Sequence, residues 1–538
     1  MLAMKMRKAS ITRLLFVVSF AVTLLLTATA QAAAPGITGP TFNLTARASF
    51  ISQPDGQMVY SWGYGCNSAP AGFNPPAAKM PGANCPTMQV PGPTLIVTEG
   101  DTVTVTLTNN LPAAAGNTSI LFPGFQVTAT GGVPGILTGP TGDAAPGANL
   151  TPPAPNSTVT YTFTASSPGT RAYYSGTQGD LQVEMGMYGA IIVLPSTIPS
   201  NCTTGAPAQN NLLAEAAHGE TDFRLASAGY DHPDTCYDRE YLFQFSEMDP
   251  SIHRKAEEQV AKANCTPITA PTCRLEVPTE PYHPAYFMIN GRSMPDDMDT
   301  NYASEYPHQP YNGNPHMHPG ELVLLRIIGQ GRWQHPFHEH GNHVRILARD
   351  GNLILSQTDS TKLAGPLLFT TTTTPGLAMD GIFYWTGKGL NWDVYGHGYS
   401  GDTTSCIADN NGYYTSAPAA INYYEWCEDH GHALEKAPFG QVAGGGPATL
   451  PDSNILTNGA WYGGSPYLGP DATVRAVGST GTTPPSGTIA NPPASEAGFA
   501  FMWHSHNERE ITTNNIFPGG MLMMMLVDSR EFQINEFF

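Results

Sequence analysis

The sequence predicts an all-β protein, and three observations carry this prediction. The 538-residue chain contains 56 glycines and 48 prolines, and only 12% of its residues are charged, which is typical of a turn-rich β protein. Many short segments alternate apolar and polar residues, as strands with one buried face do. Residues 251–262 are one of the few stretches with a helical pattern, and Ser251 is the expected N-cap.

The expected strands fall into two groups. Residues 91–112 predict two strands around a Glu-Gly-Asp turn, with Val103, Val105 and Leu107 on one face. Strands are also expected at 158–164 and 188–194 and, in the second half, at 240–245, 286–289, 322–328, 344–348, 381–385, 499–506 and 520–528.

The chain is too long for a single hydrophobic core. We therefore expect an N-terminal domain over residues 40–200, a polar connector over 201–239 and a C-terminal domain over 240–538. Residues 390–498 are rich in Gly, Ser, Thr, Asn and Pro. We interpret them as a long insertion in the second domain that is mostly irregular, with small elements that the pattern does not reveal.

Residues 1–32 have the pattern of a secretory signal peptide. Lys5, Arg7, Lys8 and Arg13 precede an apolar segment at 14–26, and Ala30-Gln31-Ala32 offers a small-residue cleavage site. A membrane anchor is the alternative, but the apolar segment is short for a membrane span. We expect export to the periplasm or beyond, with no membrane span in the mature chain.

Charge and cysteine content limit the partners and the compartment. The chain has 24 basic and 43 acidic residues, a formal net charge of −19, which disfavours binding to nucleic acid or anionic lipid but not to metal ions or small neutral substrates. Eight cysteines in an exported chain predict disulfides. The simplest connectivity pairs near neighbours, although the sequence does not choose among the alternatives: 66–85, 202–236, 265–273 and 406–427.

Two histidine pairs stand out. Residues 335–343 contain four histidines, and in an extended strand His338 and His340 lie on the same face. His504 and His506 repeat that spacing far along the chain. If two strands of one sandwich bring the pairs together, four imidazoles could bind a metal ion. The alternative is that each is an ordinary surface or hydrogen-bonded histidine.

The stretch from Pro91 to Pro112 begins Pro-Gly-Pro-Thr and ends Asn-Asn-Leu-Pro. Through this stretch, the first half resembles the multicopper oxidases, whose domains have the cupredoxin fold. The segments that carry copper histidines in the family correspond here to Ile120–Gly124 and Pro168–Gly176, and no histidine occurs before His218. The resemblance therefore implies an N-terminal domain without metal ligands.

The second half keeps more of the family pattern. The His-Pro-x-His-x-His-Gly motif is intact from His335 to Gly341. By resemblance, His335 would face the blue (type 1) copper, His338 the type 2 copper and His340 a type 3 copper. The last family motif, His-Cys-His-x-x-x-His, runs from His504 to Glu510, with Ser505 in place of the cysteine and Glu510 in place of the last histidine.

The resemblance implies two cupredoxin-like Greek-key sandwiches, the second with the 390–498 insertion. Because blue copper needs a thiolate, we expect no standard laccase reaction. The main hypothesis is a copper-dependent oxidoreductase with one copper at His338, His340, His504 and His506, acting on a small molecule or a metal ion; zinc, iron or manganese are alternative metals. Other members form trimers, so a homotrimer is compatible with the resemblance.

Three alternatives stay open. The chain could be a non-enzymatic cupredoxin scaffold or metal-binding protein, which the loss of the first-domain histidines favours. His335 with Glu510 could form a weaker second metal site, with hydrolytic or zinc-type chemistry as a further possibility. Otherwise Glu510 would pair with Arg509 or Arg345, and His335 would be a packing residue kept from the fold.

Overall fold

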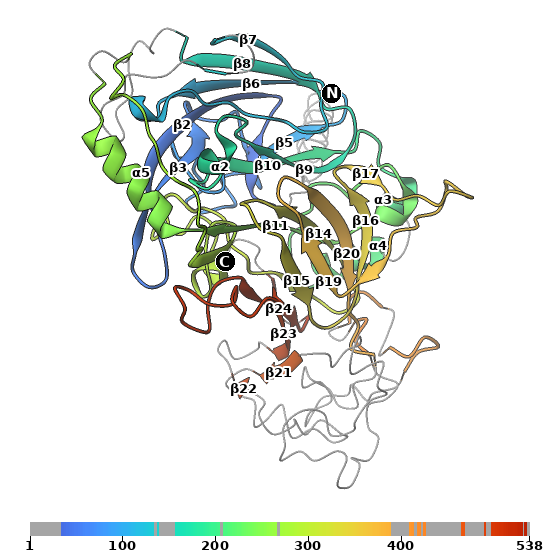
Figure 1. Cartoon of the computed structure of the whole chain (residues 1–538). Coiled ribbons are helices and arrows are strands. Elements are labelled where there is room, and N and C mark those ends of the chain that lie inside the picture. Colours follow the sequence, from blue (N-terminus) through green and yellow to red (C-terminus); the bar gives the residue numbers. More distant parts are fainter. Residues whose placement is uncertain are drawn as a thin grey trace, which may run out of the picture.

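The computed structural model describes most of the chain, and its strands form four sheets stacked as layers (Figure 1). The two cupredoxin-like β-sandwiches predicted from the sequence are confirmed. The described residues are 34–133, 137–138, 156–204, 208–265, 269–388, 408–413, 417–420, 423–426, 464–468, 489–490, 497–530 and 532–534.

The N-terminal sandwich contains two five-stranded sheets. Its outer sheet has the order β3 (Met58–Cys66), β2 (Thr41–Ser52), β6 (Thr102–Asn109), β8 (Thr158–Thr164) and β7 (Thr128–Gly131). Its inner sheet has the order β4 (Phe73–Asn74), β1 (Gly36–Thr38), β5 (Leu95–Thr98), β10 (Tyr188–Leu194) and β9 (Gly169–Tyr174). Two short helical turns, η1 (Ala113–Ala115) and α2 (Gly179–Gln182), lie between these strands in the sequence.

The C-terminal sandwich also has an inner and an outer sheet. The inner sheet comprises β12 (Tyr286–Ile289), β11 (Arg239–Met248), β14 (Leu322–Gly329), β20 (Ala378–Tyr384), β16 (Val344–Arg349) and β17 (Asn352–Leu353), with β18 (Leu367–Leu368) paired to β16. The outer sheet comprises β13 (His316–Met317), β24 (Leu522–Asp528), β23 (Ala497–Ser505), β15 (His335–Glu339) and β19 (Thr370–Thr373), joined by β21 (Gly464–Leu468) and β22 (Ile489–Ala490).

Strand alternation explains how the inner layers pack on both sides. In β10, Ile191 faces the core of the N-terminal sandwich, whereas Ile192 packs in a separate apolar cluster between the two sandwiches. In β11, Phe243 belongs to the core of the C-terminal sandwich, while Leu242 joins the same cluster between the sandwiches. Side chains at successive positions point to opposite faces, so β10 is apolar at nearly every position and β11 is buried at every position.

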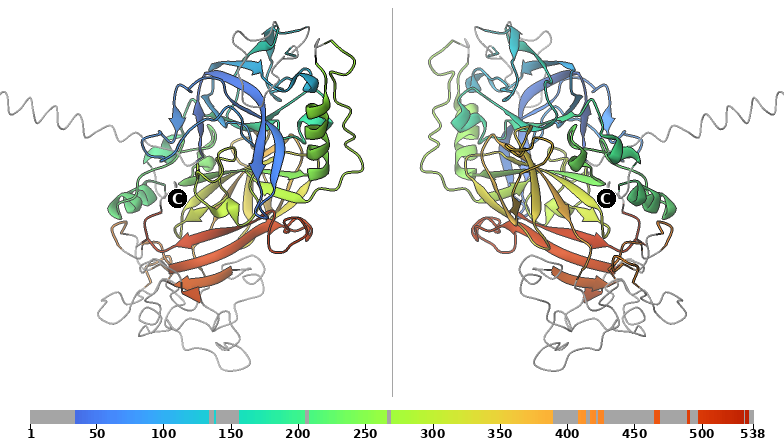
Figure 2. Two further views of the ribbon diagram at one scale, coloured as in Figure 1. Left: turned by 90° about the vertical axis from the view of Figure 1, so that its left-hand side faces the viewer. Right: turned by 90° about the vertical axis from the view of Figure 1, so that its right-hand side faces the viewer.

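This layering turns the outer face of β15 and β23 away from the N-terminal sandwich. Figure 2 shows β23 and β24 on the side of the C-terminal sandwich opposite to the N-terminal strands. One face of their sheet covers the core, and the other is the outermost face of the molecule's described sheets. Residues on that outer face are therefore separated from the N-terminal sandwich by two sheets.

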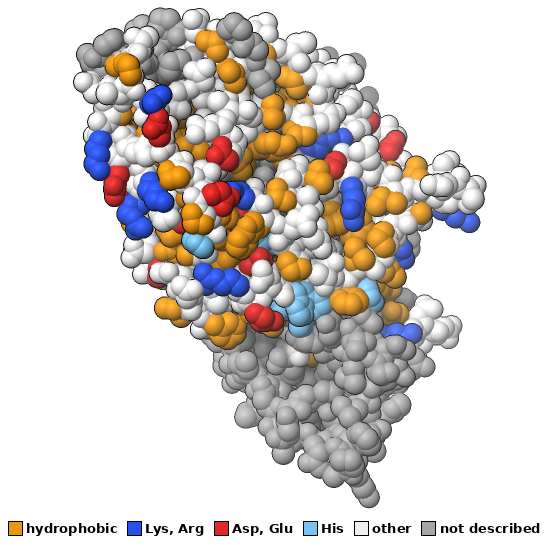
Figure 3. Space-filling view, viewed as in Figure 1, with side chains coloured by type: hydrophobic (Ala, Val, Ile, Leu, Met, Phe, Trp, Pro, Cys, Tyr) orange, Lys and Arg blue, Asp and Glu red, His pale blue; other side chains and the backbone are white. Residues whose placement is uncertain are grey.

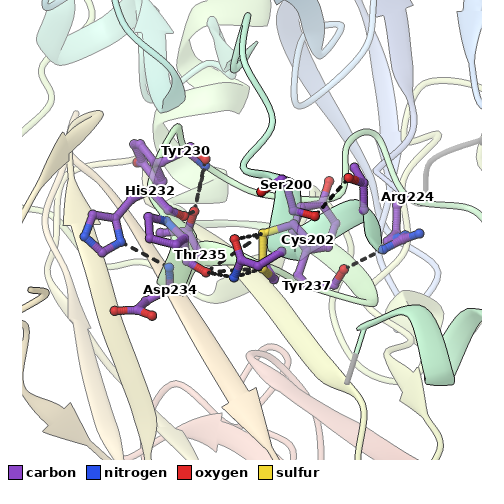
Figure 4. The surroundings of a disulfide bond; sticks show 12 residues. Ser200, Cys202, Arg224, Tyr230, His232, Asp234, Thr235 and Tyr237 are labelled. Carbon is purple, nitrogen blue, oxygen red and sulfur yellow. Dashed lines mark hydrogen bonds between the residues drawn. A yellow bond between two sulfur atoms is a disulfide. The ribbon is translucent and has the colours of Figure 1, made fainter. Parts of the chain in front are cut away.

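The connector is more structured than predicted. It contains α3 (Ser200–Thr204), α4 (Ala208–Ala217) and η2 (Pro233–Thr235), where the sequence analysis expected only a polar segment. A disulfide joins Cys202 to Cys236, and Arg224 donates a hydrogen bond to the Tyr237 carbonyl at 3.1 Å (Figure 4). The predicted domain boundaries at 200 and 240 stay predictions.

Three of the four predicted disulfides are present: Cys66–Cys85, Cys202–Cys236 and Cys265–Cys273. The predicted pair 406–427 lies outside the described residues. The predicted helix is α5 (Pro250–Lys262), but its expected cap was wrong: the Asp249 carboxylate, not Ser251, accepts from the first turn, and Pro250 occupies the first helical position. In the part of the chain that the structure describes, no helix is long and apolar enough to cross a membrane.

Candidate metal centre

Strand β15 divides the histidine-rich stretch between two faces. Phe337 is fully buried in the core and packs on Phe245, with ring centroids 4.6 Å apart. The residues beside it in sequence point the other way, so His338 and His340 share the outer face, as predicted. Their ring centroids are 4.6 Å apart.

Strand β23 presents the second pair on the same sheet face. It lies antiparallel to β15, and His338 is directly opposite His504 in the register. Cross-strand neighbours in such a pair have Cβ atoms about 4.5–5.5 Å apart. The His506 backbone N–H donates to the Pro336 carbonyl at 2.8 Å, which continues the pairing past the end of the strand.

The four imidazoles form one cluster. The ring centroid of His338 lies 5.7 Å from that of His504 and 5.1 Å from that of His506, and the His340 and His504 centroids are 5.2 Å apart. His338 and His504 are buried, His340 is half-buried and His506 is exposed. Figure 3 shows histidine side chains together on this part of the surface. The predicted meeting of residues about 165 positions apart is therefore present in the structure.

The buried rings of the cluster are uncharged at neutral pH. Burial away from water, with a smaller contribution from the neighbouring histidines, lowers the pKa of His338 to about 4 against a hydrogen bond with the Phe369 backbone. Burial also lowers the pKa of His504. A neutral imidazole has a lone pair for a metal ion, and a charged one does not.

Backbone contacts fix which nitrogen of His504 is the donor. Its Nδ1 lies 2.7 Å from the Ser505 carbonyl oxygen, which can only accept, so Nδ1 carries the proton and Nε2 carries the lone pair. That Nε2 lies 3.1 Å from Nε2 of His340. Two nitrogens bound to one ion at about 2 Å are roughly 3 Å apart, so this spacing suits either one hydrogen bond or two ligands of one ion.

Neighbouring residues hold the cluster in place. Thr370 on β19 places its hydroxyl 2.9 Å from Nδ1 of His338, and the Trp503 indole donates to the His340 carbonyl at 2.9 Å. Phe369 is 43% exposed and its ring lies 5.8 Å from that of His338. Such contacts orient imidazoles for metal binding.

The imidazole nitrogens of the cluster do not point to one common metal position. Within the described ranges, no three His, Cys, Asp or Glu side chains converge on a common ion position. The rings meet, but side-chain rotation would have to bring their lone pairs onto one point. The donor set itself, neutral imidazoles without a thiolate, suits copper or zinc.

His335 has a different environment from the four histidines of the cluster. It is fully buried, with Nε2 2.9 Å from Oε2 of Glu247 and Nδ1 2.9 Å from Oε2 of Glu510. Both ring nitrogens are therefore occupied by carboxylates, so a metal at His335 and Glu510 would have to displace one of them. The proposed pairing of Glu510 with Arg509 or Arg345 is wrong, because His335 is its partner.

The N-terminal counterparts of the family's copper segments do meet, but without ligands. Leu121 and Tyr174 exchange backbone hydrogen bonds of 2.8 and 3.3 Å. Phe122 packs on Phe163 with ring centroids 4.8 Å apart. A Cβ atom at Gly176 would lie 2.7 Å from the Leu121 side chain, so a larger residue there would require Leu121 to move. Apolar packing occupies the place where the resemblance puts a half-site.

Sequence reasoning missed several residues that shape these sites. Glu247 was not singled out, because its strand β11 carries several polar residues and the sequence does not show that all of them are buried. Thr370, Phe369 and Trp503 could not be assigned, because their roles depend on pairing between distant strands. Met521, Met523 and Met525 are fully buried in the core.

Comparisons with known proteins identify one protein family. Residues 86–197 match the family model described as multicopper oxidase. An L-ascorbate oxidase of Brassica rapa subsp. pekinensis is 36% identical over 105 residues, 20% of this chain and 16% of that protein. A multicopper oxidase of Talaromyces pinophilus is 31% identical over 127 residues, 23% of this chain and 19% of that protein. The matched segments span less than a fifth of either relative.

Solved structures are similar at a lower level. The blue copper oxidase from Nitrosomonas europaea has a TM-score of 0.41 and 16% identity, covering 90% of this chain and 85% of that one. The copper nitrite reductase from the same organism has a TM-score of 0.35 and 19% identity, covering 64% and 84%. These scores are too low to equate the metal centres of those proteins with residues here. The family-model match and both relatives nevertheless agree: this chain contains a segment similar to the multicopper oxidases, which the family model places at residues 86–197.

Proposed function

We propose that the chain is an exported copper-dependent oxidoreductase with a single copper held by His338, His340, His504 and His506. The observation that carries the proposal is the cross-strand pairing of His338 with His504, which gathers all four imidazoles on one sheet face. Copper bound there would supply one-electron redox chemistry. The substrate would be a small molecule or a metal ion.

The chain's own residues would bind and orient. His504 keeps its Nε2 lone pair toward His340 because Nδ1 is tied to the Ser505 carbonyl. Burial keeps His338 and His504 neutral, so protons compete weakly with a metal at neutral pH. Exposed His506 and Phe369 leave the cluster open to a substrate from solvent.

Standard laccase chemistry is not part of the proposal. A blue copper requires a thiolate, and Ser505 offers a hydroxyl that donates to Glu510. The family's trinuclear centre takes half its imidazoles from the first domain, where this chain has none. Electrons would therefore have to enter at the four-histidine cluster itself.

The test is metal retention with matched histidine variants. Wild-type protein is loaded with Cu(II), dialysed and assayed for copper and for oxidation of small reductants. His338→Ala and His504→Ala should lose copper and activity with little change in melting temperature. His283→Ala, an exposed histidine elsewhere, should retain both. If the cluster variants keep full copper and activity, the proposal fails.

A non-enzymatic metal-binding role is the second candidate. The apolar contact of Leu121 with Gly176 favours it, because half of the family's metal machinery has been replaced by packing. Copper that binds at the cluster but oxidises no reductant would identify this role. Copper binding and turnover that disappear together in His504→Ala would exclude it.

A further inference from the structure

The fully buried His335 forms the centre of a second cluster that the proposed copper site does not use. It lies on β15 three residues before His338, but its side chain faces the core of the sandwich. Each of its ring nitrogens lies 2.9 Å from a carboxylate oxygen, Nε2 from Glu247 and Nδ1 from Glu510. An ionised carboxylate only accepts hydrogen bonds, so both nitrogens donate and the ring is an imidazolium.

Several hydrogen-bond donors surround the Glu247 carboxylate. Its Oε1 accepts the backbone N–H groups of Arg332 at 2.7 Å and Trp333 at 2.9 Å, and the Tyr282 hydroxyl at 3.2 Å. Gly331 has a φ of +66°, and a Cβ there would lie 2.4 Å from the Glu247 carboxylate. The loop after β14 therefore closes around this side chain.

Glu510 is held equally well from the other side. The side chain is fully buried. Its Oε2 accepts the Ser505 hydroxyl as well as His335, and its Oε1 accepts the Asn507 amide at 2.9 Å. Carboxylates with this many donors are stable as anions.

Among the described residues, two further charged groups, Glu184 and Arg332, contact Tyr282 beside this cluster. The Tyr282 hydroxyl oxygen lies 2.7 Å from Glu184, and burial raises the pKa of Glu184. The Arg332 guanidinium pairs with Glu280 at 2.6 Å and lies 4.1 Å from the Tyr282 ring. The imidazolium therefore has Glu247 and Glu510 as its direct counter-charges.

We propose that Glu247, protonated His335 and Glu510 form a charge clamp in which a proton takes the structural place of a metal cation. The clamp joins β11, β15 and the segment that follows β23, at the position that the family resemblance assigns to blue copper. It needs no metal and does not depend on the proposed copper site. It holds together the two strands that carry the His-x-His pairs.

The clamp makes a prediction about pH. Burial opposes a charged ring, but the hydrogen bonds and charges of Glu247 and Glu510 outweigh it and raise the pKa of His335 from 6.5 to about 9. A group whose pKa rises on folding stabilises fully below its unfolded pKa, and that stabilisation is lost as pH rises through the folded pKa. From well below pH 6.5 to well above pH 9 the folding constant should fall by up to about 300-fold.

The experiment compares full-length wild type with His335→Gln between pH 6 and 10, in EDTA. The wild-type advantage over His335→Gln should shrink as pH rises from 6.5 to above 9. EDTA should not alter this profile, because the cation is a proton. A constant difference across the pH range, or a pH dependence abolished by EDTA, would overturn the clamp.

A direct titration covers the case in which His335→Gln does not fold. NMR of the wild-type protein should show the His335 imidazole titrating near pH 9. Glu510→Gln should lower that pKa, while Glu508→Gln, an exposed neighbour on the same segment, should leave it unchanged. A wild-type ring that titrates at 6.5 or below, or equal effects of the two glutamates, contradicts the proposal.

Discussion

At the scale of single residues, two substitutions decide what the second half of the chain can do. Ser505 replaces a thiolate with a hydroxyl, and Glu510 replaces an imidazole with a carboxylate. The Ser505 hydroxyl donates to Oε2 of Glu510, and the same oxygen lies 2.9 Å from Nδ1 of His335. The three positions still converge, but their donors now form hydrogen bonds and an ion pair.

Removing one charge from the clamp should therefore be costly. Breaking one partner out of a buried ion pair typically destabilises by about 3–5 kcal/mol, because the remaining charges lose their compensation. Glu510→Gln should lower the free energy of unfolding at pH 7 by that amount, measured by urea denaturation. Glu508→Gln should stay within about 0.5 kcal/mol. Similar free energies of unfolding for the two variants would contradict the role of Glu510 in the clamp.

At the scale of elements, strand β15 performs two tasks on two faces. Phe337 contacts Phe245 and Trp503 in the core. His338, one residue later, faces His504 across the outer surface. Successive side chains in a strand point to opposite faces. Residues that stabilise the core therefore alternate on β15 with residues proposed to bind metal.

Substitutions on the two faces should therefore change different properties: folding stability on the core face and copper binding on the outer face. Phe337→Ala should cost about 3–5 kcal/mol through the cavity it leaves, yet folded protein should retain copper. His338→Ala should leave the urea midpoint almost unchanged and lose copper. A Phe337→Ala protein that folds but binds no copper would show that the two faces are not independent.

Sequence patterns predicted much of this arrangement, and their limits have physical causes. The strands at 158–164, 188–194 and 286–289 match the structure at both ends, because alternation and flanking turns are local signals. The common face of His338 and His340 follows from the same alternation. The register between β15 and β23 and the contact of Glu247 with His335 could not be predicted, because they depend on pairing across distant segments.

Two errors also have identifiable reasons. The helix α4 was missed because its residues have little amphipathic contrast, and α3 was missed because it has only five residues. Asp249 was overlooked as the cap of α5 because Ser251 also suits a cap, but Pro250 fixes the first helical position one residue earlier.

At the scale of the whole molecule, the segments that correspond to the family's two half-sites lie in different sandwiches. The segments around Leu121 and Tyr174 belong to the first sandwich, and the histidine cluster lies on the outer face of the second, which Figure 2 shows on the side opposite to the N-terminal strands. The cluster therefore has to be self-sufficient within one chain or be covered by another molecule. Since all four imidazoles come from one sheet, copper content should not depend on assembly state.

The most direct test is electron paramagnetic resonance of the full-length protein loaded with Cu(II), alongside its copper content and its mass in solution. We expect one copper per chain, whether the protein is a monomer or a trimer. The spectrum should show hyperfine coupling to several imidazole nitrogens, and this coupling should diminish in His504→Ala. Copper bound without nitrogen coupling, or a spectrum that His504→Ala leaves unchanged, would contradict it.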